Sequence, residues 1–526
     1  MTEPHWKPIV HQKRTAQAAS IPPPWRLPKA TLSSPSLPLN PLETIHTCGL
    51  LTPQELSWTE ITDITTLTSL LSNGSITSVQ LTTAFCKRAA IAQQLTGCLT
   101  EIFFDRALER ARNLDEEFAR SGRVSGPLHG VPVSVKDRFD VAGSDTTVGW
   151  VGLANKPAKE SDAVVKLLES MGAVLYVKTN IPQSLMMSDS YNHVFGQSLN
   201  GLNTSLISGG SSGGEGALVG CGGSILGIGT DIGGSIRVPS NLQGLYCICP
   251  STGRVPWDCS YMHQHYLVPP VVGPMARSLD TVEYFMQALS DSNPWDLDPG
   301  CVPIPWRKEL AAKPEPGRKV KLGIVYDDGV VRPQPPVMRA MREVAKRLVE
   351  RGHEVVEWDT TLHNRGTPLW TSSVTADGGS HCQALTTIIN EPLISGMIVG
   401  DSSSLLSSSQ RETLEEEKYA FQASYLAQWK REGIDALLLP VTPWVGYRPK
   451  EWVRSSQWLG YSAVFNLLDY AGVTVPVIHV DESLDKGDND VDLVKGMPVT
   501  VQIVGGRFGE EKAISVAKVV DGLFGR

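Results

Sequence analysis

Alternation between hydrophobic and other positions predicts a β-strand that ends at Lys136. Valines stand at 131, 133 and 135, with other residue types between them. A period of two is the spacing of a strand, whose successive side chains point to opposite faces. Lys136 is therefore expected on the face opposite the valines. Residues 105–120 instead carry apolar side chains every three or four positions, which predicts an amphipathic helix.

Further along the chain, predicted helices and strands alternate. A helix that ends at Gly172 precedes a strand over 173–178. A strand–helix–strand pattern over 321–357 follows a proline-rich stretch at 293–318. This alternation indicates an α/β fold, although the proline-rich break is also typical of a boundary between two domains. Residues 1–50 are rich in Pro, Ser and Thr and lack periodicity, so we expect an extended N-terminal arm.

Composition and charge narrow the class of protein. The chain has 526 residues, 41% hydrophobic and 19% charged, as in ordinary globular proteins. A net charge of −8 without a basic tract argues against nucleic-acid binding. Nine cysteines without a C-x-x-C pair fit a disulfide framework poorly and favour a reducing compartment. No apolar run approaches the roughly 18 residues of a membrane span, and no signal-peptide core is visible. We therefore expect a cytoplasmic protein without a membrane span.

Three segments offer a nucleophile, a proton relay and a base without any histidine. Lys136 ends its predicted strand, Ser211 lies in a stretch at 208–223 with many glycines, and Ser235 follows two glycines. A serine hydroxyl is a weak nucleophile unless a neighbouring base accepts its proton. Serine–lysine pairs are a known variant of the serine–histidine arrangement. The sequence therefore indicates an amide or ester hydrolase.

These segments resemble the motifs of the amidase signature family. The matching runs are Gly-Val-Pro-Val-Ser-Val-Lys136-Asp, Gly-Gly-Ser211-Ser-Gly-Gly and Asp-Ile-Gly-Gly-Ser235, at spacings similar to the family's. The resemblance implies that Lys136 is the base, Ser211 the bridging serine and Ser235 the nucleophile. Glu215-Gly-Ala resembles the branch of fungal acetamidases and fatty-acid amide hydrolases. Further matching runs around Trp25 and over 498–505 extend the resemblance across most of the chain.

The resemblance also implies a fold and a reaction. It implies one α/β domain over residues 51–526, built on a single large mixed β-sheet covered by helices on both faces, with an N-terminal arm over 1–50. The strands of the 321–357 segment are then expected in that same sheet. The implied reaction is hydrolysis of a small-molecule carboxylic amide to the acid plus ammonia or amine, through an acyl-enzyme on Ser235. No metal or organic cofactor is implied.

Two properties stay open at this point. The substrate can be a short aliphatic, aryl or fatty amide, or a biosynthetic intermediate. Related enzymes suggest a homodimer, and the sequence does not settle the oligomeric state.

Residues around the nucleophile have predicted supporting roles. Consecutive glycines let backbone N–H groups point into one space, where they can stabilise an oxyanion. The predicted oxyanion donors are the N–H groups of Ile232, Gly233, Gly234 and Ser235. The predicted substrate-binding residues are Leu185, Met186, Met187 and Ser211. The residues expected to support the loops are Ser212, Thr230, Asp231 and Arg237.

Lys136 can act as a base only if it is neutral near pH 7, whereas the ordinary pKa of lysine is about 10.4. Burial and nearby positive charge both lower a lysine pKa. Arg138 stands where the family more often has an uncharged residue. Either its charge lowers the pKa of Lys136 further, or it pairs with a nearby acid.

Two other interpretations compete with this one. Residues 209–213 also match G-x-S-x-G, the nucleophile elbow of α/β-hydrolases, which would make Ser211 the nucleophile and His381 or His479 the base. That interpretation leaves Ser235 unexplained. The second alternative is an inactive relative that only binds amides, or an amidotransferase subunit. The intact Lys136, Ser211 and Ser235 argue against inactivity, and Glu215 and the acetamidase-like N-terminal arm argue against the amidotransferase.

Overall fold

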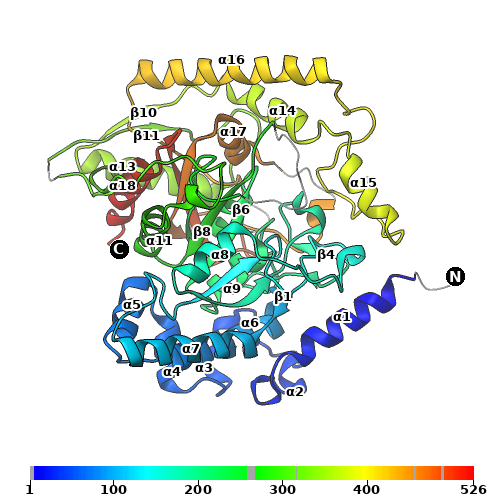
Figure 1. The fold of residues 1–526 in the computed structure, drawn as a ribbon. Helices are drawn as coiled ribbons and strands as arrows, with labels where there is room; N and C mark the ends of the chain where they lie inside the picture. The colour runs from blue at the N-terminus through cyan, green and yellow to red at the C-terminus, as the bar shows by residue number, and fades with distance from the viewer. Residues whose placement is uncertain (1–4, 258–266, 316, 454–457, 487–490, 526) are drawn as a thin grey trace.

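A single mixed β-sheet organises the chain (Figure 1). The computed structural model describes residues 5–257, 267–315, 317–453, 458–486 and 491–525. Within these ranges the strands of the sheet are β1 Leu99–Ile102, β2 Pro132–Lys136, β3 Val174–Thr179, β6 Leu226–Asp231, β7 Tyr246–Cys249, β8 Val271–Ala276, β9 Lys321–Ile324, β10 Glu354–Glu357, β11 Ala436–Pro440, β12 Ala471–His479 and β13 Pro498–Gly506. Their order across the sheet is β1-β3-β2-β6-β8-β7-β12-β13-β11-β9-β10. A separate ribbon pairs β4 Tyr191–Asn192 with β5 Gly196–Gln197.

Helices cover both faces of this sheet, which confirms the predicted fold class. Those of the described residues are α1 Lys7–Ala19, α2 Lys29–Leu32, α3 Pro41–Thr47, α4 Pro53–Glu60, α5 Ile64–Ser72, α6 Ser78–Thr96, α7 Phe104–Ser121, α8 Ala163–Ser170, α9 Gly213–Gly220, α10 Arg237–Gln243, α11 Leu279–Asp291, α12 Lys308–Ala311, α13 Pro335–Glu350, α14 His363–Val374, α15 Ser380–Thr387, α16 Ser408–Glu432, α17 Gly460–Leu468 and α18 Glu510–Gly522. Among them, none is both long and apolar enough to cross a membrane.

The elements predicted from periodicity are present. The alternating valines form β2, and the helix predicted over 105–120 is α7, which buries Ala107, Ala111 and Leu114 on one face. The segment over 321–357 forms β9, α13 and β10, and β9 pairs in parallel with both β10 and β11. This segment therefore extends the one continuous sheet, and the proline-rich stretch before it does not separate two sheets.

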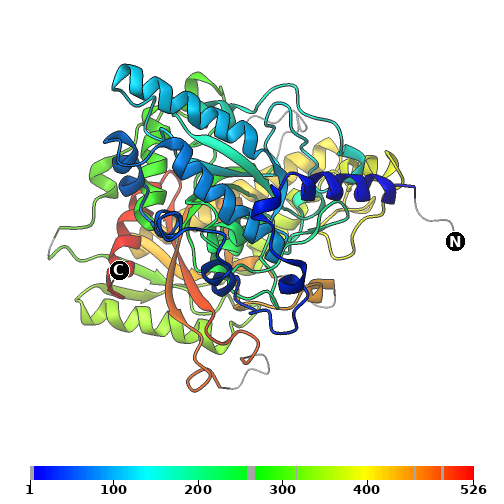
Figure 2. The same ribbon diagram turned by 90° about the horizontal axis from the view of Figure 1, so that it is seen from below.

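The first fifty residues differ from the expected extended arm, because they contain α1, α2 and α3. Figure 2 shows α1 reaching along one side of the molecule toward the N-terminus. α1 buries no side chain, so hydrophobic periodicity could not reveal it. Polar contacts hold it instead: Lys13 Nζ lies 2.7 Å from a carboxylate oxygen of Glu101 and 2.6 Å from one of Asp145. The division of the chain at residue 50 stays a prediction.

The order of the strands brings the carboxyl ends of β2, β3 and β6 together at one edge of the sheet. β2 lies between β3 and β6 and runs parallel to both, so the carboxyl ends of all three meet there. Such an edge is where open α/β sheets bind ligands. α9 packs over β2, β3 and β6 with its amino end at this edge. The N–H of Gly214 donates to the carbonyl of Asn180 at 2.9 Å.

We predict that Gly214→Ala destabilises the fold. A Cβ atom on Gly214 would collide with the backbone N of Asn180, so α9 would have to move away from the sheet. Overpacking of this kind typically costs about 1–3 kcal/mol. Thermal unfolding should show a lowered Tm.

Gly522→Ala is the matched control, since Gly522 is also helical and only the end of the Lys313 side chain approaches its added Cβ. Alanine is the better helix former, so this control should keep or raise the Tm. Equal melting temperatures for the two variants would contradict the close packing of α9.

Candidate active site

Lys136 is the last residue of β2, and its amine is completely buried. Lys136 Nζ donates to Ser211 Oγ at 2.8 Å. It also lies 2.9 Å from Thr230 Oγ1 and 3.3 Å from the carbonyl oxygen of Thr230, which belongs to the neighbouring strand β6. Among the described residues, no carboxylate forms an ion pair with this amine. Its partners are therefore two hydroxyl groups and one carbonyl.

This environment favours the neutral amine. Burial lowers the pKa of Lys136 well below its ordinary value of 10.5, and the positive charge of Arg138 lowers it further. The negative charge of Asp231 acts in the opposite direction without reversing the shift. Glu215 lies on α9 beneath the site and accepts hydrogen bonds from Ser134 and Thr179. Burial raises the pKa of Glu215 to about 8, so this carboxyl is mostly neutral at pH 7.

Ser211 lies on the loop that leads into α9, and this loop contacts the loop that carries Ser235. The N–H of Ser212 donates to the carbonyl of Ser235 at 3.0 Å. Ser212 Oγ lies 3.3 Å from both the backbone N and the backbone O of Thr230, so Ser212 joins the loop that carries Ser211 to β6. Ser211 is buried, whereas Ser235 is partly exposed. Both serines border the same cavity.

A buried ion pair holds the loop between β6 and α10. Arg237 Nη2 lies 3.0 Å from Asp231 Oδ1, and both residues are fully buried. Asp231 also accepts the backbone N–H of Gly234 at 2.7 Å and of Ile236 at 3.0 Å. These contacts hold the pKa of Asp231 well below its ordinary value of 3.8, chiefly through the charge of Arg237, although burial alone would raise it. The predicted supporting residues 231 and 237 thus lie together and bracket Ser235.

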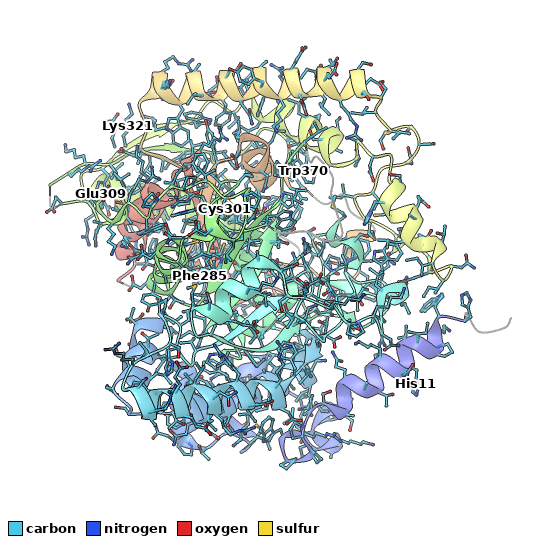
Figure 3. All side chains as sticks on the ribbon, viewed as in Figure 1. His11, Phe285, Cys301, Glu309, Lys321 and Trp370 are labelled. Carbon is cyan, nitrogen blue, oxygen red and sulfur yellow. The ribbon has the colours of Figure 1, made fainter. Side chains whose placement is uncertain are left out.

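Two residues remote in sequence hold the carbonyl groups of this loop. Trp370, labelled in Figure 3, comes from α14, and its Nε1 donates to the carbonyl of Ile232 at 2.7 Å. Ser462 Oγ, from α17, donates to the carbonyl of Gly233 at 2.6 Å. In a trans peptide the N–H points away from the carbonyl. Trp370 therefore fixes the direction of the N–H of Gly233, and Ser462 that of Gly234.

The geometry at Gly234 differs from the predicted oxyanion set. The N–H of Gly234 is donated to Asp231 and is not available to an oxyanion. The groups left for that role are the N–H groups of Ile232, Gly233 and Ser235. Glycine is nevertheless required at 234, since its φ of 132° is rare for other residues and an added Cβ would collide with Ser462 Oγ.

A cavity of about 170 Å³ opens at the two serines. Its walls are mostly apolar, and they include three of the four predicted substrate-binding residues, Leu185, Met186 and Ser211. Met187 packs with Ile394 and Trp452 and borders a smaller hollow of about 20 Å³, which Ser235 and Gly233 also line. The far wall comes from the segment that runs from the end of α14 to the first turn of α16, which the sequence motifs do not mark. Its cavity-lining members include Val374, Ala376, Asp377, His381, Cys382, Leu385, Ile398 and Arg411.

The two alternatives for Arg138 are compatible. The chain turns directly after β2, where the N–H of Arg138 donates to the carbonyl of Lys136 at 2.7 Å. Arg138 Nη1 then lies 3.3 Å from Asp162 Oδ2, and the guanidinium stacks over the ring of Trp257 at 4.5 Å. The guanidinium also borders the cavity. Arg138 is therefore paired with an acid and still lowers the pKa of Lys136.

The nucleophile-elbow interpretation does not fit this arrangement. An elbow serine stands between a strand and a helix, whereas Ser211 follows a long loop that leaves the small ribbon at β5. Lys136, and not a histidine, is the basic group within hydrogen-bond distance of Ser211. His381 borders the cavity, and His479 ends β12 far along the sheet order from β2.

Sequence reasoning missed Trp370, Ser462 and Asn466. Asn466 accepts from Arg237 Nη2 at 2.6 Å and completes the support of the ion pair. All three contact the nucleophile loop from helices more than a hundred residues away. An isolated tryptophan or serine on a helix carries no local pattern that would have identified it.

Comparison with known proteins gives one consistent result. The family model described as Amidase matches residues 80–514. An acetamidase of Emericella nidulans is 34% identical over 99% of this chain and 98% of its own length, and one of Aspergillus oryzae is 34% identical over the full length of both. A solved fatty acid amide hydrolase superposes with a TM-score of 0.91 at 30% identity, covering 99% of this chain and 95% of the other.

These matches confirm the resemblance to fungal acetamidases and fatty-acid amide hydrolases, and they include the segments that carry Lys136, Ser211 and Ser235. The structural match also accounts for the large mixed sheet. The chain therefore belongs to the amidase family and is an amide-hydrolysing enzyme.

Proposed function

We propose that the enzyme cleaves a carboxylic amide through an acyl-enzyme on Ser235, with Ser211 and Lys136 as the proton relay and base. The observation that carries this proposal is the 2.8 Å hydrogen bond between Ser211 Oγ and the buried amine of Lys136. Burial lowers the pKa of this amine and so favours its neutral form, which can accept a proton. Ser211 and Ser235 line the same cavity, which supports Ser211 as the link between that amine and the reacting serine.

In the proposed acylation step, Ser235 Oγ attacks the amide carbon. The hydroxyl proton of Ser235 passes to Ser211, whose own proton passes to Lys136. The same relay then returns a proton to the amide nitrogen, so that the C–N bond breaks and ammonia or an amine leaves. Water subsequently attacks the ester on Ser235 and releases the acid. A relay that can donate as well as accept suits an amide, because the amine is a poor leaving group until it is protonated.

The charge that develops on the carbonyl oxygen also needs partners. The N–H groups of Ile232, Gly233 and Ser235 are the proposed donors, with Trp370 holding the orientation of the middle one. One such donor is typically worth about 10²–10³-fold in kcat. The apolar cavity walls are suited to an apolar acyl or amine group. The solved relative is described as a fatty acid amide hydrolase and the curated relatives as acetamidases, so these amides are the substrates to test first.

A fluorophosphonate probe should form an adduct on Ser235, because such probes react with activated serines. Peptide mapping by mass spectrometry would locate the label, and Ser235→Ala should lower amide turnover by at least about 10³-fold. Label on Ser211 would instead favour the elbow interpretation. A folded sample with no label and no turnover would favour a binding subunit.

Lys136→Ala should impair amide hydrolysis more than ester hydrolysis. An alcohol can leave without prior protonation, whereas an amine cannot. Loss of the proton donor therefore slows hydrolysis of the amide more than hydrolysis of the ester. We expect a fall of about 10²–10⁴-fold in kcat for the amide, as for removal of a general acid–base group. Matched amide and ester substrates with the same acyl group make the comparison. An equal loss for both would contradict the role of Lys136 in protonating the leaving group.

Arg138→Met should move the acid limb of the kcat/KM profile to higher pH. Activity requires neutral Lys136, so it rises as pH passes through the pKa of that amine. Removing the nearby positive charge raises this pKa, and the expected shift is on the order of half a pH unit.

Two further variants test whether the charge near Lys136 sets the direction of this pH shift. Asp162→Asn removes the negative partner of Arg138 and should shift the limb to lower pH. Arg112→Met, on the exposed side of α7, should leave it unchanged. If Arg138→Met and Asp162→Asn shifted the limb in the same direction, electrostatic tuning by Arg138 would be excluded.

A further inference from the structure

A buried carboxyl group lies beneath Lys136 and takes no part in the proposed proton relay. Glu215 is fully buried on α9. Its Oε2 lies 2.6 Å from Ser134 Oγ of β2, and its Oε1 lies 2.9 Å from Thr179 Oγ1 of β3. Gly227 of β6 leaves the space that the carboxyl fills, since an added Cβ there would collide with Oε2. The carboxyl of Glu215 thus joins α9 to three neighbouring strands.

The hydroxyl groups next to Glu215 form a chain of three oxygen–oxygen contacts. Ser134 Oγ lies within hydrogen-bond distance of both Glu215 Oε2 and Ser224 Oγ, at 2.6 Å and 3.0 Å. Ser224 Oγ in turn lies 2.8 Å from the carbonyl oxygen of Leu226. Each of these contacts needs one hydrogen, and a serine hydroxyl supplies one whereas a carbonyl supplies none. The two serines therefore provide two hydrogens for three hydrogen bonds.

A protonated carboxyl supplies the missing hydrogen. The O–H of Glu215 then donates to Ser134, and Ser134 donates to Ser224. The hydroxyl of Ser224 donates to the carbonyl of Leu226, while Thr179 donates to the other carboxyl oxygen. Every contact has its hydrogen in this state. When Glu215 is ionised, it accepts from both Ser134 and Thr179, and one contact of the chain is left without a hydrogen.

The charges around Glu215 favour the same state. The titratable groups that face it are Lys136 on β2, Tyr176 on β3 and Cys98 just before β1. Burial raises the pKa values of Tyr176 and Cys98, so both are neutral near pH 7. Lys136 is the one group of the three that can become positive, and burial lowers its pKa. Among the described residues Glu215 forms no ion pair, and a buried carboxylate without a partner is unfavourable.

The hydrogen bond between Glu215 and Ser134 connects the two elements that carry the base and the relay. Ser134 and Lys136 are two residues apart on β2, so their side chains lie on the same face of the sheet. Ser211 precedes Glu215 by four residues, on the loop that leads into α9. The alignment of β2 with α9 sets the 2.8 Å contact between Lys136 Nζ and Ser211 Oγ. Glu215 is therefore placed to maintain that contact.

We propose that Glu215 is a positioning residue that acts as a hydrogen-bond donor: its carboxylic acid proton binds Ser134 and fixes β2 against α9 without placing an anion beneath Lys136. A carboxylate at this position would raise the pKa of Lys136 and favour the protonated, unreactive amine. A protonated glutamate supplies one donor and one acceptor in a neutral group. The catalytic part of this inference rests on the proposed role of Lys136, whereas the protonation of Glu215 does not.

Infrared difference spectroscopy of the full chain tests the proton directly. The spectrum of the wild type minus that of Glu215→Gln should contain the C=O band of a protonated carboxyl at pH 7. Carboxylate bands should replace it as the pH rises through about 8, because burial raises the pKa of Glu215 to that value and the proton is held below it. Carboxylate bands already present at pH 7 would overturn the proposal. This result does not depend on turnover, so it decides the state of Glu215 even if Lys136 is not the base.

Glu109→Gln on α7 is the spectroscopic control, since it makes the same change at an exposed helical site. Its difference spectrum should contain carboxylate bands at pH 7, as for a glutamate in water. Circular dichroism and thermal unfolding show that each variant is folded before its spectrum is compared.

The pH profile of amide hydrolysis tests the positioning role. Glu215→Gln keeps a donor for Ser134 and an acceptor for Thr179, so its kcat/KM should stay within about threefold of the wild type, with the acid limb unmoved. Glu215→Leu fills similar space without a donor, and its kcat/KM should fall at least about tenfold, because small misalignments of reacting groups slow catalysis strongly. If Glu215→Leu does not fold, Ser134→Ala removes the same hydrogen bond and should lower kcat/KM in the same direction.

Two kinetic outcomes would contradict the proposal. If Glu215 were ionised in the wild type, Glu215→Gln would remove a negative charge near Lys136 and move the acid limb to lower pH, by on the order of half a pH unit or more. Wild-type kcat/KM in the folded Glu215→Leu and Ser134→Ala variants would exclude a positioning role for this hydrogen bond.

Discussion

The buried amine of Lys136 is the feature on which the rest of the active site depends. Removing a charged group from water costs several kcal/mol, and no carboxylate in the described part of the chain contacts this amine to offset that cost. Lys178, on the neighbouring strand β3, is equally buried, yet its Nζ lies 3.0 Å from Asp137 Oδ1. Two lysines on adjacent strands thus have opposite surroundings. The unpaired one is the candidate base, because an ion pair would favour its protonated and unreactive form.

The reactive loop has the opposite electrostatic design. Asp231 and Arg237 are both buried and paired, and Asn466 and Gln502 complete the contacts of the guanidinium. Breaking a buried pair by removing one partner typically costs about 3–5 kcal/mol. The contacts join the loop after β6 to helix α17 and strand β13, late in the sequence. The carboxyl-terminal part of the chain therefore orders the segment that presents Ser235, which explains how widely separated segments contribute to one site.

Sequence reasoning identified the elements and residues that local sequence patterns mark. The period of two placed Lys136 at a strand end, and the strand–helix–strand pattern gave β9, α13 and β10. It could not identify α1, which has no apolar face and is held by side chains such as Lys13. It also included Gly234 among the oxyanion donors, because which N–H faces the cavity depends on Asp231, Trp370 and Ser462 in three dimensions.

The many glycines at 208–223 connect composition to chemistry. The sequence suggested that they let the backbone approach either backbone or substrate. In the structure the close partners are protein groups, as at Gly214, where an added Cβ would collide with the backbone of Asn180. Missing side chains therefore allow α9 and its loop to pack directly on the strand ends. Such packing excludes water from Lys136, and water exclusion is the main cause of its lowered pKa. The glycines thus act on the base through packing, without touching the reacting atoms.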